Sequence, residues 1–470
     1  MRKSYAYVFS ILFFLMISNG SNAQATPDKT VQQDTTNIVI SSIKITGNKR
    51  TKNYIILREV QFKEGDRLHK TDLAKNLSDA RNQVNNTNLF TEVKIDSLLL
   101  EDSSLQVNIK VKEKWYVYPS PQFQLADRSL NEWIKTYHAD LNRVIYGLKF
   151  AHYNFSGRRD QLKIYLLNGY ARNFSASYNN PFINKALTQG ISYSAGFTQN
   201  REIGYKINYF NRVVNFKKPG FVRNSFSSSV GYNIRKGFFK STGYGLSLTY
   251  INVNDSVITS KYNPYYFNSS RHTQLFPEIS FGVGYSKTDN NNYPLKGLAY
   301  AYGISKRGIG FTGGINSTTF SGGIAKYISH KNNFYSTVQS SALIELPFNQ
   351  AFINLAGIGL RGTEYYAING VANAVVKYTL SKKVVAFRIP IPFKIKTVPY
   401  IPMKIFAKTY ADAGYSYTPS QFISRFNNKL LYAGGFGLDI LTLYDIVLKV
   451  EFSFNQLGEK GLFLHGKSGF

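Results

Sequence analysis

The pattern of apolar and polar positions divides the chain into two parts of different character. From residue 116 to residue 470, stretches of about ten residues alternate apolar and polar side chains, with Gly, Asn, Asp, Ser and Lys between them. A period of two is typical of β-strands, because successive side chains point to opposite faces of a sheet. Clear examples are NSFSSSVGYNIR, GYGLSLTYINVN, EISFGVGYSKT and IVLKVEFSFNQ. The pattern predicts an all-β region with no useful length of helix.

The number and length of these stretches favour a closed transmembrane barrel. A spanning strand with its turn or loop takes roughly 20–24 residues, so residues 116–470 accommodate roughly 16 antiparallel strands. A soluble β-sandwich is the alternative, but it would not need so many Tyr and Phe or strands so evenly spaced. No run of about 18 apolar residues follows the first 23, so the pattern predicts no transmembrane helix.

Residues 36–115 combine both periodicities and predict a small α+β domain. IVISSIKITGN alternates and indicates a strand that ends at Gly47-Asn48, and FKEGD indicates a turn around Gly65. TEVKIDSLLL and SLQVNIKVKEKW indicate two further strands, joined by a turn at 101–103. Two helices lie between, with Thr51 and Thr71 as expected caps and apolar faces at Ile55, Ile56 and Val60, and at Leu73, Leu77, Ala80 and Val84. The predicted order is β-α-α-β-β.

The first residues have the form of a secretory signal peptide. Arg2 and Lys3 precede a short apolar run, and Ser21-Asn22-Ala23 has the small-x-small form of a cleavage site. We therefore expect residues 1–23 to be removed and residues 24–35 to form a flexible polar lead-in. A membrane anchor is the alternative, but the run is too short to span comfortably. The chain has no cysteine, so neither a lipoprotein anchor nor a disulfide is expected.

Charge and aromatic content are concentrated in the second region. The chain has 57 basic and 27 acidic residues, of which 40 and 15 lie in residues 116–470, together with 63 of the 72 aromatic residues. Such a composition can indicate nucleic-acid binding, but the signal peptide argues against that partner. Aromatic girdles and a charged lumen suit an outer-membrane barrel. Basic loops would suit the anionic outer leaflet, so outer-membrane lipid and lipopolysaccharide are expected partners.

Residues 357–362, GIGLRG, fit the GxGxxG spacing of a dinucleotide-binding loop. That loop needs a helix after it and an acidic residue roughly 20 positions further on. Residues 363–380 have no helical period, and Lys382 and Lys383 occupy the position of the acid. The motif is therefore not interpreted as a cofactor site.

No other stretch predicts enzyme chemistry. The six histidines show no metal-ligand spacing, GxSxG is absent, and the acid pair Glu101-Asp102 is most simply part of a turn. We expect no enzyme, no metal and no cofactor.

Residues 36–115 resemble a POTRA domain. The resemblance rests on the element order, the Gly-Asn turn, the segment NLFTEV from Asn88 to Val93, and a final pattern of Ile109, Val111 and Glu113. It implies a periplasmic domain whose sheet edge binds an extended polypeptide. Another small α+β domain with the same element order is the alternative.

The arginine motif resembles a signature of the BamA/TamA superfamily of outer-membrane insertases and translocators. Leu360-Arg361-Gly362-Thr363, followed by Tyr365-Tyr366 and Gly370, is similar to the family's Val-Arg-Gly-Phe/Tyr motif. Residues 410–414 (YADAG) resemble its aromatic-x-Asp-x-Gly wall motif, and 431–441 (LYAGGFGLDIL) its antepenultimate strand.

The resemblance implies that the sixth extracellular loop folds back into the barrel. Arg361, with Gly359 and Gly362 beside it, would then pair with Asp412, next to Gly414 on the inner wall. An arginine fork suits a carboxylate, and a buried arginine needs a partner. A solvated loop arginine is the alternative. Two positions depart from the family: Thr363 replaces an aromatic residue, and Lys377 lies where an acid is frequent.

The two ends of the barrel carry the last expectation. The chain ends at Phe470, and a terminal aromatic on a strand resembles the β-signal for barrel assembly. Gly466 would weaken this closing strand, and Pro119 and Pro121 mark the expected first strand as an edge. The resemblance implies a lateral gate between the two strands.

Together these features imply insertion or translocation of polypeptides at the outer membrane. Expected clients are unfolded β-barrel or secreted polypeptides, with periplasmic accessory proteins as possible partners. The alternatives are a two-partner secretion translocator, which typically has two POTRA domains and a plug helix, and a passive pore or surface structural protein with no client.

Overall fold

The computed structural model describes residues 37–101, 104–126, 130–308, 314–346, 358–390, 400–419, 424–442 and 446–467. The predicted signal peptide (1–23), the predicted lead-in (24–35) and Phe470 lie outside these residues. None of the helices in the described part of the chain has the length and apolar character needed to cross a membrane.

The N-terminal domain has the predicted order with one short strand added. Its elements are β1 (Asn37–Thr46), α2 (Asn53–Leu57), β2 (Arg67–His69), α3 (Lys70–Asn85), β3 (Phe90–Leu99) and β4 (Leu105–Glu113). The sheet order is β2-β1-β4-β3, in which β1 runs parallel to β4 and the other pairs are antiparallel. Sequence did not predict β2, because three residues are too few to show a period.

The structure contradicts both predicted helix caps. Helix α2 begins after Lys52, and α3 begins after His69, so that Thr71 lies inside the first turn of α3. The Thr51 hydroxyl instead lies 3.0 Å from the Tyr116 hydroxyl and accepts a 2.9 Å hydrogen bond from Asn154. The Thr51 side chain, which local sequence predicted to be a helix cap, therefore forms hydrogen bonds with residues distant in the sequence.

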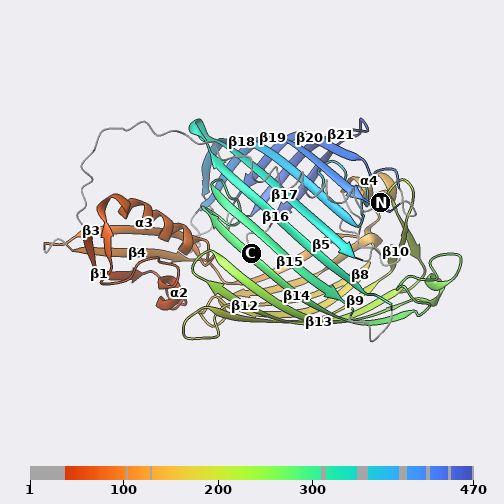
Figure 1. Cartoon of the computed structure of the whole chain (residues 1–470), viewed down its shortest axis with the longest axis horizontal. Coiled ribbons are helices and arrows are strands. Elements are labelled where there is room, and N and C mark those ends of the chain that lie inside the picture. Colours follow the sequence, from red (N-terminus) through yellow and green to blue (C-terminus); the bar gives the residue numbers. More distant parts are fainter. Residues whose placement is uncertain are drawn as a thin grey trace, which may run out of the picture.

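The second region is the predicted barrel of 16 antiparallel strands (Figure 1). The strands are β5 (Val117–Leu125), β6 (Val144–Tyr153), β7 (Gln161–Gly169), β8 (Ala171–Asn180), β9 (Gln189–Asn200), β12 (Arg223–Lys236), β13 (Lys240–Val253), β14 (Thr273–Thr288), β15 (Gly297–Arg307), β16 (Ser317–Ser329), β17 (Phe334–Leu346), β18 (Ala372–Pro390), β19 (Tyr400–Tyr417), β20 (Leu430–Leu441), β21 (Val447–Asn455) and β22 (Lys460–Lys467). Each pairs with its neighbour in chain order, except that β9 pairs directly with β12.

Several loop elements were not predicted. β10 (Glu202–Ile207) and β11 (Val213–Lys217) form a separate hairpin between β9 and β12. The short helix α4 (Leu130–Tyr137) lies between β5 and β6, and three single 3-10 turns span Leu141–Arg143, Asp255–Ile258 and Lys331–Asn333. These elements lie in the connections between strands, where strand periodicity gives no information.

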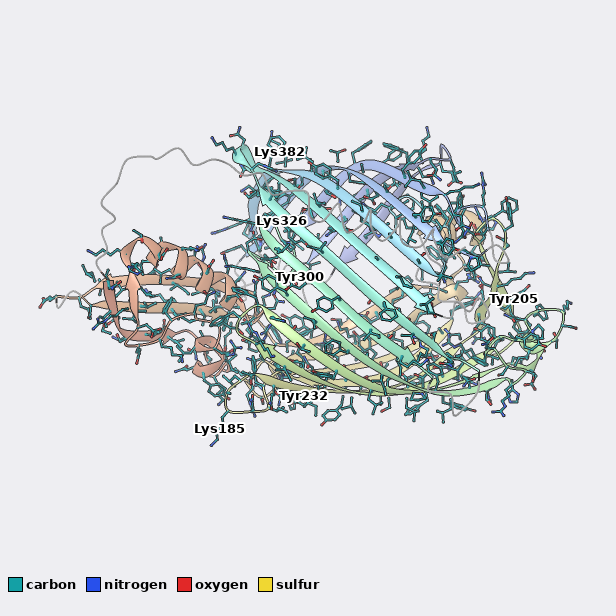
Figure 2. All side chains as sticks on the ribbon, in the orientation of Figure 1. Lys185, Tyr205, Tyr232, Tyr300, Lys326 and Lys382 are labelled. Carbon is teal, nitrogen blue, oxygen red and sulfur yellow. The ribbon has the colours of Figure 1, made fainter. Side chains whose placement is uncertain are left out.

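The two faces of the barrel strands differ as a membrane wall requires. On β13, Tyr244, Leu246 and Leu248 are exposed on the outside, while Gly245 and Ser247 alternate with them on the inside. Large apolar side chains that point away from the sheet are what lipid contact demands. Figure 2 labels two aromatic side chains of the barrel strands, Tyr232 of β12 and Tyr300 of β15.

The ends of the sheet, β5 and β22, form its seam. Pro119 and Pro121 lie in β5 and take register positions only with β6. Among the residues that the structure describes, no ladder joins β5 to β22. Proline lacks the N–H that such a ladder would need.

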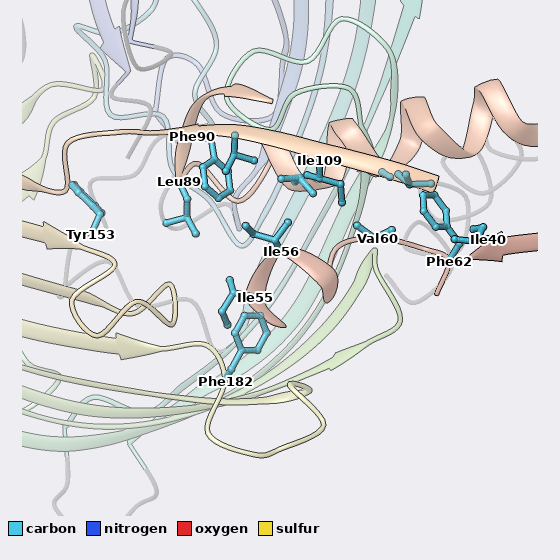
Figure 3. Close-up of a cluster of buried hydrophobic side chains, with 14 of the residues drawn as sticks. Ile40, Ile55, Ile56, Val60, Phe62, Leu89, Phe90, Ile109, Tyr153 and Phe182 are labelled. Carbon is cyan, nitrogen blue, oxygen red and sulfur yellow. The ribbon is translucent and has the colours of Figure 1, made fainter. Parts of the chain in front are cut away.

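The N-terminal domain packs its core directly against one end of the barrel, which we call the domain end. Ile55, Leu89 and Phe90 share one apolar cluster with Tyr153 and Phe182 of the barrel (Figure 3). Phe182, in the turn between β8 and β9, is only 1% exposed. Apolar burial therefore continues from the domain into the barrel.

A buried ion cluster reinforces this junction. The Glu59 carboxylate accepts two hydrogen bonds of 2.6 Å from the Arg235 guanidinium and lies 3.5 Å from Arg159. Glu59 is 1% exposed. Burial lowers the pKa of the Arg159 guanidinium, and the Glu59 carboxylate opposes that shift. We name this set of three the Glu59 clamp.

Candidate functional site

The inner face of β19 presents a row of functional side chains. Because side chains alternate along a strand, Phe406, Lys408, Tyr410, Asp412 and Gly414 all point into the lumen. The first four are each at most 6% exposed. Sequence reasoning found Tyr410, Asp412 and Gly414 through their motif and missed Phe406 and Lys408.

The segment from Ile358 to Gly370 lies against this row and carries Arg361 to Asp412. The Arg361 guanidinium contacts both carboxylate oxygens, with an Nε–Oδ2 distance of 2.8 Å. The Arg361 backbone N–H also donates to Asp412 Oδ2, at 3.2 Å. The Asp412 side chain is fully buried and that of Arg361 is 15% exposed. The pair is therefore bidentate and largely removed from water, the geometry in which Arg binds a carboxylate most strongly.

Further contacts hold the rest of the Arg361 fork. Its Nη1 donates to the Thr379 hydroxyl at 3.1 Å, and the Tyr410 ring centroid lies 3.9 Å from the guanidinium carbon. Tyr410 is itself held by its hydroxyl, 2.6 Å from that of Ser453. A planar cation over an aromatic face adds electrostatic attraction in a dry site.

Lys377 has a defined role despite its departure from the family pattern. Its ammonium group donates to the carbonyl of Gly359, and so binds the backbone of the loop rather than an acid. Thr363, the other departure, donates from its hydroxyl to the Leu360 carbonyl at 2.9 Å.

The loop is sealed to the wall by apolar contacts as well as charge. Leu360, Tyr366 and Ile368 cluster with Phe426 and with Leu431 of β20. Glycine makes room for this approach at Gly414, where an added Cβ would lie 2.9 Å from the Ile358 side chain. The inner face of β18–β20 therefore provides a complementary binding surface for the loop.

The two loop glycines provide a matched test of this docking. Gly362 and Gly359 both have positive φ, 76° and 68°, but only at Gly362 would a Cβ meet the wall, 2.9 Å from Ser453 Cβ. Both alanine variants should lose about 1 kcal/mol of loop stability to backbone strain. Gly362→Ala should lose about 1–3 kcal/mol more, because overpacking forces the loop off the wall.

The measurement is protease cleavage of the loop in the detergent-purified protein. Equal cleavage rates for Gly362→Ala and Gly359→Ala would contradict close docking at Gly362.

A second buried ion cluster lies beside the arginine. Lys408 donates to Asp439 of β20 and to Glu451 of β21, the latter at 2.6 Å. Glu451 lies 3.9 Å from Arg361 and 3.3 Å from His465 of β22. The Lys408–Asp439–Glu451 triad thus links the docked loop to the closing strand. In the sequence, Asp439 and Glu451 each lie between two apolar residues of a predicted strand, and this pattern could have marked them as inward-facing charges.

The remaining predicted residues lie apart from the arginine pair. Gly466 is part of β22, at the register position of Leu448. Phe470 lies outside the described residues.

Comparisons with known proteins agree with this architecture. Residues 38–114 match the POTRA family, described as a surface antigen variable number repeat. The outer membrane protein assembly factor BamA of Neorickettsia risticii (strain Illinois) is 26% identical over 303 residues, which cover 60% of this chain and 35% of that protein. The chain therefore spans about a third of the length of this curated relative.

Two solved structures are similar to this chain at low sequence identity. BamA from Haemophilus ducreyi lacking POTRA domains 1–3 has a TM-score of 0.49 at 14% identity, covering 92% of this chain and 84% of its own. CdiB from Escherichia coli has a TM-score of 0.49 at 12% identity, covering 94% and 92%. The POTRA match over residues 38–114, the similarity to the curated BamA and the 16-stranded sheet together support an outer-membrane β-barrel similar to BamA, preceded by a POTRA domain.

Proposed function

We propose that this protein inserts or translocates polypeptides at the outer membrane without catalysing a chemical reaction. The POTRA domain, over residues 36–115, would receive unfolded β-barrel or secreted clients, and the barrel, over 116–470, would pass them into or across the membrane. Accessory periplasmic proteins, outer-membrane lipid and lipopolysaccharide are proposed partners. The observation that carries the proposal is the loop docked in the lumen by Arg361 and Asp412.

The docked loop supports this function more than a passive pore. A diffusion pore needs an open lumen, whereas here a buried bidentate ion pair and an apolar cluster hold a loop against the inner wall. Beside the loop, small side chains of β13–β18 leave a cavity of about 730 Å³, lined among others by Gly243, Gly282, Gly303 and Ser341. The lumen therefore has one side on which the loop is held and another side on which small side chains leave open space.

The seam supports a lateral gate as the route for clients. β5 contains two prolines, and the described residues of β5 and β22 share no ladder. An edge strand with unpaired backbone groups is a template for an incoming strand. We propose that a client pairs with this edge, and that Phe470 marks the closing strand as the assembly signal.

A reversible crosslink across the seam should block function. Cysteines placed near residues 121 and 466 can be joined selectively, because the chain has no native cysteine. We expect oxidation to stop client assembly and a reducing agent to restore it, with unchanged folding of the barrel itself on gels. Full activity in the crosslinked protein would contradict the gate.

Depletion followed by proteomics of the outer membrane tests the function as a whole. Loss of other barrels or of surface proteins would support insertion or translocation. An unchanged protein content with altered solute uptake would support a pore, and loss of a single large secreted partner would support a two-partner secretion translocator.

A further inference from the structure

The turn between β14 and β15, residues 289–296, connects the POTRA domain to a distant part of the barrel wall on the periplasmic side, and its conformation is fixed by internal hydrogen bonds. The Asp289 carboxylate accepts hydrogen bonds from the backbone of Leu295 and Lys296, at 2.9 and 3.0 Å. The Asn290 side chain accepts two more, from the backbone of Asn292 and Tyr293, at 2.7 and 3.0 Å. Asp and Asn side chains that bond nearby backbone groups fix a turn in one conformation.

One side of this turn is bound to the POTRA domain. The Asn86 side chain donates to the Thr288 carbonyl at 3.1 Å and accepts from the Asn291 backbone at 3.0 Å. The Asn292 side chain donates to that of Asn88, also at 3.0 Å. Asn86 and Asn88 directly follow α3, so any movement of this helix is applied to the turn.

The other side reaches a distant part of the barrel wall. The Tyr293 hydroxyl donates to Asp439 Oδ2 of β20 at 2.9 Å, and its ring centroid lies 5.0 Å from that of Phe406 of β19. Three strands, β16, β17 and β18, separate β15 from β19. Burial and the Asp439 carboxylate raise the pKa of Tyr293, so the hydroxyl stays protonated as a donor.

Asp439 is also a member of the buried triad. Its other oxygen accepts from Lys408, which binds Glu451, which in turn faces Arg361 and His465. A continuous series of contacts therefore runs from the end of α3 through Tyr293 to the docked loop and to the closing strand.

We propose that Tyr293 is a positioning residue that couples the POTRA domain to the docked loop and the closing strand. The turn acts as a strut: when α3 is seated, Tyr293 holds Asp439, and Asp439 holds Lys408 and Glu451 in place for Arg361. When the POTRA domain tilts away from the barrel, the turn moves with it, Tyr293 leaves Asp439, and the docked loop loses part of the support that the triad gives to Arg361. This role rests on the proposed function, in which a client on the POTRA domain must alter the barrel.

The test uses Tyr293→Phe with a cysteine reporter beneath the loop. Ala433 of β20 is 6% exposed and lies in the apolar cluster under Leu360, so Ala433→Cys reacts with a thiol reagent only when the loop lifts. We expect Tyr293→Phe to raise the labelling rate about tenfold, the effect of losing one hydrogen bond to a charged group. The phenylalanine ring keeps the packing on Phe406.

Coupling is measured by adding Glu59→Gln, which loosens the Glu59 clamp. With Tyr293 present, Glu59→Gln should raise the labelling rate of Ala433→Cys. In the Tyr293→Phe background it should add little, because the hydrogen bond to Asp439 is already lost. Equal fold-changes in both backgrounds would overturn the proposal, as would unchanged labelling in Tyr293→Phe alone.

Two controls separate the strut from general effects. Tyr335→Phe removes a hydroxyl from the other ring packed on Phe406, 5.9 Å away, and this hydroxyl makes no hydrogen bond among the described residues. It should leave labelling unchanged, and a rise equal to that of Tyr293→Phe would overturn the specific role. Labelling needs no client, so its outcome is independent of whether the barrel assembles polypeptides.

Discussion

Replacing Asp412 with arginine is expected to release the loop from the barrel wall and to abolish client assembly. The change places a second guanidinium beside Arg361 in a site where the carboxylate is fully buried. Removing one partner of a buried ion pair costs about 3–5 kcal/mol, because the other charge stays buried without compensation. Arg361→Asp should have an effect of similar size, since it places a carboxylate beside Asp412 and Glu451.

The double variant Arg361→Asp, Asp412→Arg should recover part of what each single variant loses. Recovery will be incomplete, because Thr379 and Tyr410 are arranged to hold an arginine at position 361. The labelling rate of Ala433→Cys measures the release. Each single variant should raise this rate more than a hundredfold, and in the double variant the rate should be at least tenfold lower than in either single variant.

The Arg307–Glu278 pair is the matched control. It is also an arginine–carboxylate contact inside the barrel, at 2.8 Å, but its side chains are 31% and 24% exposed. Exchanging these two charges should cost no more than about 1 kcal/mol and leave the loop docked. A double variant at 361 and 412 that recovers nothing would contradict the pairing.

The second large effect is expected at the junction of the two domains. Glu59→Gln keeps the shape of the side chain and removes the charge that Arg235 and Arg159 share. Two partly buried guanidinium groups would then lie close together without their shared carboxylate, and burial already lowers the pKa of Arg159. We expect the junction to weaken by about 3–5 kcal/mol.

Limited proteolysis in detergent measures this weakening as release of the POTRA domain from an intact barrel. Glu92→Gln is the control, because its ion pair with Lys94 lies on the surface, with side chains 49% and 65% exposed. It should behave as the native protein does. If Glu59→Gln resisted protease equally well, the clamp would not be what holds the domain.

The features that sequence predicted are those with a local or repeated signal. Period-two alternation recurs in many of the barrel strands, as in Tyr244, Leu246 and Leu248, so the all-β class of residues 116–470 and the approximate number of strands followed from it. The Arg-Gly segment and the Asp-x-Gly segment were found by resemblance, and the structure places Arg361 against Asp412. The role of that contact stays a proposal.

The features that sequence did not predict depend on contacts between distant residues. Glu59 meets Arg235 across 176 positions, and Asn86 meets Thr288 across 202, so no window of sequence contains both partners. Thr51 was assigned to a cap because its partners Tyr116 and Asn154 lie 65 and 103 positions away. Residues 289–296 are rich in asparagine, but the role proposed for Tyr293 depends on its contacts with Asp439 and Phe406, which are remote in sequence.

The most direct test of the account is assembly of a client by the purified protein in liposomes. An unfolded outer-membrane barrel is added from urea, and its conversion to a protease-resistant, heat-modifiable form is followed over time. The account predicts that the native protein accelerates this conversion and that Asp412→Arg, inserted in equal amount, does not. Equal rates with native protein and with empty liposomes would contradict it.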